Sequence, residues 1–250
     1  RNTVLFPQQV IPIYIGREKS LKLISDIELE KRKYIIVVAQ EDGSIEDPST
    51  EDLYSYGTLA TVLKVFAMPD NSKSAIVQGI ARVKILDYLS KEPYFKAAAS
   101  KVSDDPISDS SELDDIVDNL RTSFADLIKV APNLTEEHTG MLSNIKKPNR
   151  LVDRAVSLMT LPNQEKQEIL EEVNIKSRID KAISIINREI QRIKLGEEIQ
   201  TEVHDEIAKT QREYYLREQM KAIQKELGED EGTVELKELE KRIKLSLIHI

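Results

Sequence analysis

The stretch SDDPISDSS, residues 103–111, divides the 250-residue chain into two parts whose apolar residues follow different periods. It combines serine, aspartate and a proline, which is the composition of a linker. Before it, apolar residues form short β-branched runs. After it, they recur about every 3.6 residues, as on one face of a helix. The change predicts an α+β protein, in which a β-rich part at residues 1–103 is joined by a linker at 104–111 to a helical part.

The first part carries five strand signals and one helix signal. The run YIIVVA at residues 34–39 is apolar and β-branched without interruption, which is typical of a strand buried on both faces. Leu21, Ile24 and Ile27 fall on one face of a helix predicted at residues 17–30. The other predicted strands are residues 11–15, 59–66, 75–86 and 94–102.

Helical periodicity dominates the second part. Residues 112–173 are predicted to form a bundle of short helices, and Pro132, Pro148 and Pro162 are each expected to end a helical stretch, because proline lacks a backbone N–H. No proline occurs at residues 174–228, which are predicted to form one long helix that completes the bundle and projects from it. At about 1.5 Å per residue this helix would span roughly 80 Å. Residues 229–250 are predicted to form a short helix and a tail, and the apolar end LSLIHI, residues 245–250, is expected to be non-native.

The predicted long helix carries two apolar stripes. The first is a heptad-like seam that predicts pairing with another helix, and its residues are Ile179, Ile183, Ile186, Ile190 and Ile193. The second contains two adjacent tyrosines, which a two-helix seam cannot easily bury together because they point about 100° apart. One interpretation is that one tyrosine packs in the seam and the other lies against Arg or Lys side chains. The other is a contact surface for a partner or an unfolded protein, with the candidate contacts Tyr214, Tyr215, Leu216, Met220, Ile223 and Leu227.

Composition and motifs argue against several classes of function. The formal net charge of −8 disfavours overall attraction to nucleic acid or to an anionic membrane. The chain has no cysteine, and His138, His204 and His249 are far apart, so neither thiol catalysis nor a histidine metal site is expected. Ser177 and Lys181 share a helix face, but no glycine loop that could stabilise an oxyanion lies near them. The sequence therefore predicts no catalytic residue, no cofactor site and no metal site.

Four segments of the chain are long or specific enough to compare with known families: QREYYLREQMKAIQKELGE (211–229), FPQQVIPIYIGREKS (6–20), DLYSYGT (52–58) and VQGIAR (77–82). They resemble the N-terminal region of the Lon family of ATP-dependent proteases. The resemblance implies a β domain similar to the PUA-like pseudo-barrel, followed by helices. It also implies a region associated with substrate recognition and with support of a hexamer. The family's Walker motifs and its catalytic serine and lysine have no matching positions here, so ATP and magnesium would be used elsewhere in the parent protein.

Three hypotheses about function follow. The favoured one is a non-catalytic region of a Lon-like serine protease that binds unfolded or damaged proteins and contacts other subunits of a homohexamer. The first alternative is a coiled-coil-like oligomerisation module, and the second is a nucleic-acid-binding module, which the acidic balance disfavours. No membrane partner is expected. The expected location is the bacterial cytoplasm, with the mitochondrial matrix as the alternative.

Overall fold

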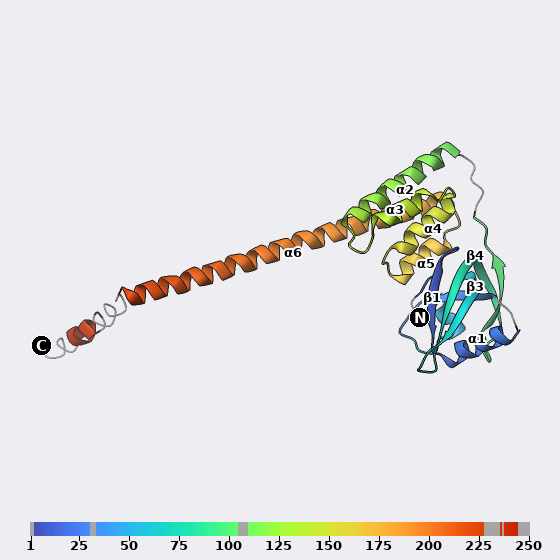
Figure 1. Ribbon diagram of the computed structural model, residues 1–250, viewed down its shortest axis with the longest axis horizontal. Helices are drawn as coiled ribbons and strands as arrows, with labels where there is room; N and C mark the ends of the chain where they lie inside the picture. The colour runs from blue at the N-terminus through green and yellow to red at the C-terminus, as the bar shows by residue number, and fades with distance from the viewer. Residues whose placement is uncertain (1–2, 31–33, 105–109, 228–235, 237, 245–250) are drawn as a thin grey trace. The chain divides into compact units, whose positions relative to one another are not determined.

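The computed structural model describes residues 3–30, 34–104, 110–227, 236 and 238–244. The chain forms two compact units, Arg1–Gln191 and Arg192–Ile250. The first unit contains an antiparallel sheet followed by short helices, and one long helix runs from the first unit into the second (Figure 1). The α+β fold class predicted from the sequence is confirmed.

The sheet has five antiparallel strands in the order β1-β4-β3-β2, and β5 also pairs with β4. Their bounds are β1 (Val10–Ile15), β2 (Tyr34–Gln40), β3 (Leu53–Ala67), β4 (Lys73–Ser90) and β5 (Lys96–Lys101). The first half of β4 pairs with β1 and its second half with β5, so this long strand organises the sheet. All five predicted strands are present, and β3 and β4 are longer than their apolar runs indicated.

Strand β2 lies at an edge of the sheet, so the prediction of a strand buried on both faces is wrong. In the part of the chain that the structure describes, β2 pairs only with β3. Tyr34 is 66% exposed, and the side chains of residues 35–38 are only half-buried. A continuous apolar run also suits an edge strand that borders a groove, and periodicity alone does not separate these two cases.

The core of the β part lies between the sheet and helix α1 (Glu18–Glu30). Ile24 and Ile27 of α1 pack with buried residues of the sheet, and half-buried Leu21 joins them as predicted. The other buried members of this cluster are Leu5, Ile15, Ala60, Ala75 and Val77.

The N-terminal segment is held against β4 at Gly79. The N–H of Gln8 donates to the Gly79 carbonyl at 2.8 Å, and the N–H of Gly79 donates to the Gln9 carbonyl at 2.9 Å. A Cβ at Gly79 would lie 2.3 Å from the Phe6 carbonyl oxygen, so only glycine permits this close approach of two backbones. Gly79 therefore fixes where the first residues of the chain lie.

The helical part of the first unit contains α2 (Ser110–Val130), α3 (Glu136–Ser143), α4 (Pro148–Leu158), α5 (Asn163–Glu171) and the start of α6 (Ile175–Glu226). Helix α2 begins inside the segment predicted as a linker. Pro148 is the first residue of α4, and Pro162 directly precedes α5. These two prolines therefore begin helices, where a missing N–H costs nothing. Helices α3 and α4 also end before these prolines, as predicted, so each proline lies between the end of one helix and the start of the next.

Part of the heptad-like seam of α6 is buried within the first unit. Ile179 and Ile186 are both fully buried, as is Ala182 on the same face. Ile183, Ile190 and Ile193 are partly exposed. The chain's own first unit covers the buried members of the seam, so these residues are not available for the alternative hypothesis of oligomerisation.

The described residues of the second unit form the part of α6 from Arg192 onward and a short helical segment. Every residue at positions 194–227 is exposed. Residues 236 and 238–244 are helical and exposed, while the apolar tail predicted at 245–250 lies outside the described residues. None of the helices described here is long and apolar enough to cross a membrane.

Candidate protein-binding surfaces

Four charged side chains join the sheet to the helices inside the first unit. Arg82 of β4 donates to Asp153 of α4 through two parallel bonds, Nη1 to Oδ2 at 2.9 Å and Nη2 to Oδ1 at 2.5 Å. Arg178 of α6 donates to Asp104, which follows β5, at 2.6 Å. Arg82, Asp153 and Arg178 are all buried. This cluster fixes strand β4, helix α4 and the first turn of α6 with respect to one another.

The pKa values of the two carboxylates of this cluster, Asp153 and Asp104, are shifted in opposite directions. Burial raises the pKa of Asp153 above its ordinary value, and the Arg82 guanidinium opposes that rise. Burial would also raise the pKa of Asp104, but hydrogen bonds from Asn149 and Arg178, with the charge of both guanidinium groups, hold that pKa below its ordinary value. Since every partner lies within the chain, the cluster has a structural role.

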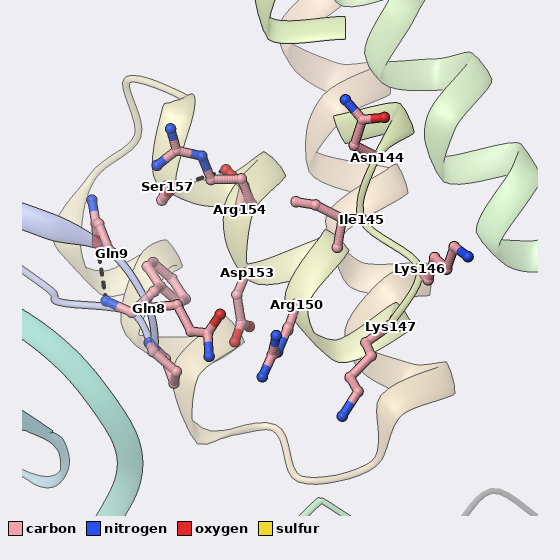
Figure 2. A pocket seen from close by; sticks show the side chains of 12 residues that line it. Gln8, Gln9, Asn144, Ile145, Lys146, Lys147, Arg150, Asp153, Arg154 and Ser157 are labelled. Atoms are coloured by element: carbon pink, nitrogen blue, oxygen red, sulfur yellow. Dashed lines mark hydrogen bonds between the residues drawn. The ribbon is translucent and has the colours of Figure 1, made fainter. Parts of the chain in front are cut away.

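A pocket of about 460 Å³ adjoins this cluster, between residues 6–9 and helix α4 (Figure 2). Four cations line it, namely Lys146, Lys147, Arg150 and Arg154. Figure 2 shows Lys147 and Arg150 extending one way, while Lys146 and Arg154 extend in other directions. Their charges do not converge on one point, so the pocket has a basic rim but no focused site for an anion.

The other polar motifs of the sequence do not assemble into reactive sites. Among residues 3–30, 34–104, 110–227, 236 and 238–244, no group of three or more His, Asp or Glu side chains could hold a metal ion. Lys181 Nζ lies 2.5 Å from Glu172 Oε2. The amine of Lys181 is therefore engaged with a carboxylate of the chain itself.

A mainly apolar groove of about 990 Å³ in the first unit follows strand β2. Residues 34–38 line it consecutively. Because successive side chains of a strand point to opposite faces, a hollow lined by five consecutive residues must run along the edge of the strand. Its other apolar lining comes from α1, from β4 and from the residues around the start of β5, namely Leu23, Ile27, Ile85, Tyr88, Tyr94, Phe95 and Ala97. Charged residues line it too, among them Glu18, Lys19, Asp26, Glu46 and Lys96.

The backbone of β2 presents hydrogen-bonding groups to this groove. A Cβ at Gly57 of β3 would lie only 2.6 Å from the Val37 carbonyl oxygen, so Val37 directs its backbone groups toward β3. Neighbouring residues in an antiparallel strand alternate in this respect. Ile36 and Val38 therefore direct their N–H and C=O groups toward the groove.

Charged residues at one end of the groove are paired with each other. Lys19 Nζ lies 3.3 Å from Glu92 and 3.8 Å from Asp47, and it stands 5.7 Å from the centre of the Phe95 ring. Arg17 donates to Gln40 at the end of β2 at 3.0 Å. These contacts link α1 to the loop after β2 and to the β4–β5 hairpin, and they leave the groove itself mainly apolar.

The six contacts predicted on α6 are all exposed, between 53% and 71%. Leu216, Met220, Ile223 and Leu227 follow steps of four, three and four residues and lie on one face. Tyr214 and Tyr215 are turned from Leu216 by about 200° and 100°, so the structure does not bring all six together. Both tyrosines are exposed, and the interpretation in which one packs in a seam is not seen in this chain.

The model of a known protein family matches residues 1–188, which include the sheet, the charge cluster and the groove. The matching model is that of the ATP-dependent protease La (LON) substrate-binding domain. The chain belongs to this Lon family. The resemblance found in the sequence is thereby confirmed.

Full-length relatives and solved structures agree with this assignment. The chain is 40% identical to a Lon protease of Koribacter versatilis and 38% identical to one of Dictyoglomus thermophilum. Each match covers 97% of this chain and 30% of the relative, so the chain spans about a third of the relatives' length. The N-terminal domain of a Mycobacterium avium complex Lon protease has the same fold, with a TM-score of 0.60 and 19% identity over 74% of this chain and 94% of that one.

The residues matched by the Lon family model include the groove but not the contacts predicted on α6. The groove along β2 lies inside the matched residues 1–188, whereas the six predicted contacts on α6 lie beyond them. Sequence reasoning missed both the groove and the charge cluster. One signal for the cluster was available: Asp153 stands among Leu151, Val152, Ala155 and Val156 on the apolar face of its helix, where a carboxylate needs a buried partner.

Proposed function

We propose that this chain is the part of a Lon-type ATP-dependent serine protease that engages unfolded or damaged proteins. It performs no catalysis itself, and ATP and magnesium act in other parts of the parent protein. The parent protein assembles as a homohexamer and works in the cytoplasm, a location supported by the bacterial origin of its relatives.

The apolar groove along β2 is the observation that carries this proposal. An unfolded protein differs from its folded form by exposing apolar side chains and unpaired backbone groups. The groove offers a partner for both, since its walls are mainly apolar and Ile36 and Val38 direct backbone groups into it. Its volume of about 990 Å³ is at the upper end for ligand pockets, which suits a segment of polypeptide.

The exposed apolar stripe of α6 supplies a second proposed contact. Leu216, Met220, Ile223 and Leu227 form one continuous face, with Tyr215 beside it. Exposed apolar surface of this kind marks sites of interaction with other proteins.

Binding of a permanently unfolded protein tests the proposed function. We expect the fluorescence anisotropy of a labelled unfolded protein to rise saturably with the concentration of this chain, and the folded form to give no change. Tyr34→Asp should weaken the binding, whereas Leu86→Asp should not. Tyr34 is 66% exposed and lines the groove, while Leu86 is 64% exposed and does not, so the pair is matched in exposure. Absence of binding up to about 100 μM, or roughly −5.5 kcal/mol, would contradict the proposal.

A second candidate function is oligomerisation through α6. It is favoured by the exposure of Leu195, Ile199, Val203 and Ile207 in addition to the face described above, because a helix with this much apolar surface is stabilised by pairing. Sedimentation of the chain at micromolar concentration tests this function. Concentration-dependent association that Met220→Lys abolishes would support it, and a strict monomer would count against it.

A further inference from the structure

We propose that an extended segment of an unfolded polypeptide binds by adding a strand to the free edge of β2. The segment takes its place in the groove and exchanges backbone hydrogen bonds with Ile36 and Val38, while its alternate side chains enter the apolar walls. This inference rests on the proposed function and specifies the class of ligand, an extended apolar segment without proline. Addition of a strand to an exposed sheet edge is a general mode of peptide recognition.

Strand β2 is the unprotected edge of the sheet. Proteins usually protect an edge strand with proline, with lysine or with a bulge. Strand β1 contains Pro12, and β5 begins with Lys96 and ends with Lys101. Strand β2, YIIVVAQ, contains neither proline nor a charged residue, and its irregularity lies at the far end, between Val38 and Gln40. An edge of this kind is a template for another strand.

The groove determines which strand can reach this edge. Leu23 and Ile27 of α1 line the same hollow as β2, and so do Tyr94 and Phe95, so this edge lies within a groove. A single extended segment fits such a groove, whereas the edge of a second folded sheet is kept out by the walls. Residues 34–38 would pair with about five residues of ligand, a length of roughly 16 Å.

The lining of the groove favours apolar side chains in the ligand. Charges of both signs line the groove, including Lys96, Asp26 and Glu46, and Lys19 is paired with Glu92 and Asp47, so no net charge of one sign selects an acidic or a basic segment. Ile35 and Val37 on one face of β2 and Ile36 and Val38 on the other present β-branched side chains, which pack well against β-branched partners across a strand pair.

N-methylated peptides test the backbone hydrogen bonds directly. The probe is a short capped peptide of alternating valine and threonine, with two derivatives that are N-methylated either at every valine or at every threonine. Because alternate N–H groups of a strand point to opposite edges, one derivative loses the bonds to β2 and the other keeps them. We expect one derivative to bind the 250-residue chain at least about tenfold more weakly and the other to bind like the parent peptide. Equal effects of the two derivatives, whether both bind or both fail, would overturn the proposal.

Amide hydrogen exchange provides a second measurement within the chain itself. Peptide binding should slow exchange at Ile36, whose N–H faces the groove, and leave Val37 unchanged, because its N–H already faces β3. Slow exchange at Ile36 without peptide, together with a dimer in sedimentation, would show a second copy of the chain on the edge and overturn the assigned ligand. If the unfolded protein binds while the peptide tests fail, only this proposal falls. If the unfolded protein does not bind either, the proposed function falls with it.

Discussion

The guanidinium of Arg82 and the carboxylate of Asp153 form a bidentate ion pair between strand β4 and helix α4, across 71 residues of sequence. Both side chains are buried, and the Nε of Arg82 also donates to the Leu170 carbonyl at 3.0 Å. The sheet and the helices of the first unit therefore share a polar connection that neither part could satisfy alone. Its loss should affect the whole unit.

Breaking this pair should strongly destabilise the first unit. Asp153→Asn leaves the two buried guanidinium groups of Arg82 and Arg178 with the single carboxylate of Asp104, and we expect it to lower the free energy of unfolding by about 3–5 kcal/mol. Urea denaturation followed by circular dichroism measures this change. As a control, Asp126→Asn removes the exposed ion pair with Lys129, which should cost less than about 1 kcal/mol. Equal losses for the two variants would contradict the role given to the buried pair.

Asp104 should make stability depend on pH in the acid range. Its pKa in the folded chain is lower than its ordinary value of 3.8, so its charged form is favoured by folding. Its contribution is present above about pH 4 and is lost as the pH falls through the lowered pKa. The free energy of unfolding, measured against pH, should therefore fall more steeply for the original chain than for Asp104→Asn. Parallel curves would show that the contacts of Asp104 with Arg178 and Asn149 contribute little.

Gly79→Ala should displace the N-terminal segment. The added methyl group would meet the Phe6 carbonyl at 2.3 Å, a backbone atom that cannot turn away. We expect a loss of about 1–3 kcal/mol in the free energy of unfolding, as for other overpacked sites. Gly140→Ala is the matched control, since nothing lies within 4 Å of the new Cβ and the residue is inside α3. It should stabilise the chain by about 0.5–1 kcal/mol. A thermal melt of both variants gives the comparison.

Replacing the two tyrosines of α6 should weaken the binding of an unfolded protein without changing the stability of the chain. Tyr214→Ala/Tyr215→Ala removes side chains that are 68% and 63% exposed, so the thermal unfolding midpoint of the chain should not change. We expect weaker binding of an unfolded protein in the anisotropy assay, because apolar contact area is lost. Leu89→Ala, at 68% exposure on β4, serves as the control. If the tyrosine variant binds like the original chain, these two residues are not contacts.

The order of strands and helices could be predicted because it depends on local patterns. The switch of period after residue 103 separates the sheet from the helices, and every predicted strand is present. The edge position of β2 could not be predicted, because an apolar run looks the same beside a core and beside a groove. The spacing of Ile179 and Ile186 identifies an apolar face of α6, and the chain's own first unit covers it.

The candidate site was the least predictable part of the protein. The groove combines α1 with parts of β2, β4 and β5, and only the folded chain brings these segments together. The six residues proposed on α6 were accessible to sequence reasoning because their exposure depends on a single helix. These six apolar side chains are too closely spaced along the helix for a single two-helix seam to bury them all. In the structure all six are exposed. The sequence therefore located an exposed apolar surface on one helix, but not a hollow formed by several elements.

Because Arg178 is buried in the first turn of α6, the N-terminal part of this helix should resist local opening better than its C-terminal part. The Arg178 side chain has no exposed surface and donates to Asp104 and to the Glu172 carbonyl, whereas residues 194–227 are all exposed. Local opening is cheapest where few buried contacts are lost. A nonspecific protease should therefore shorten α6 from its far end and stall before the turns around Arg178, leaving a resistant fragment close to residues 1–191. Helix α6 would then unfold locally from its C-terminal end only.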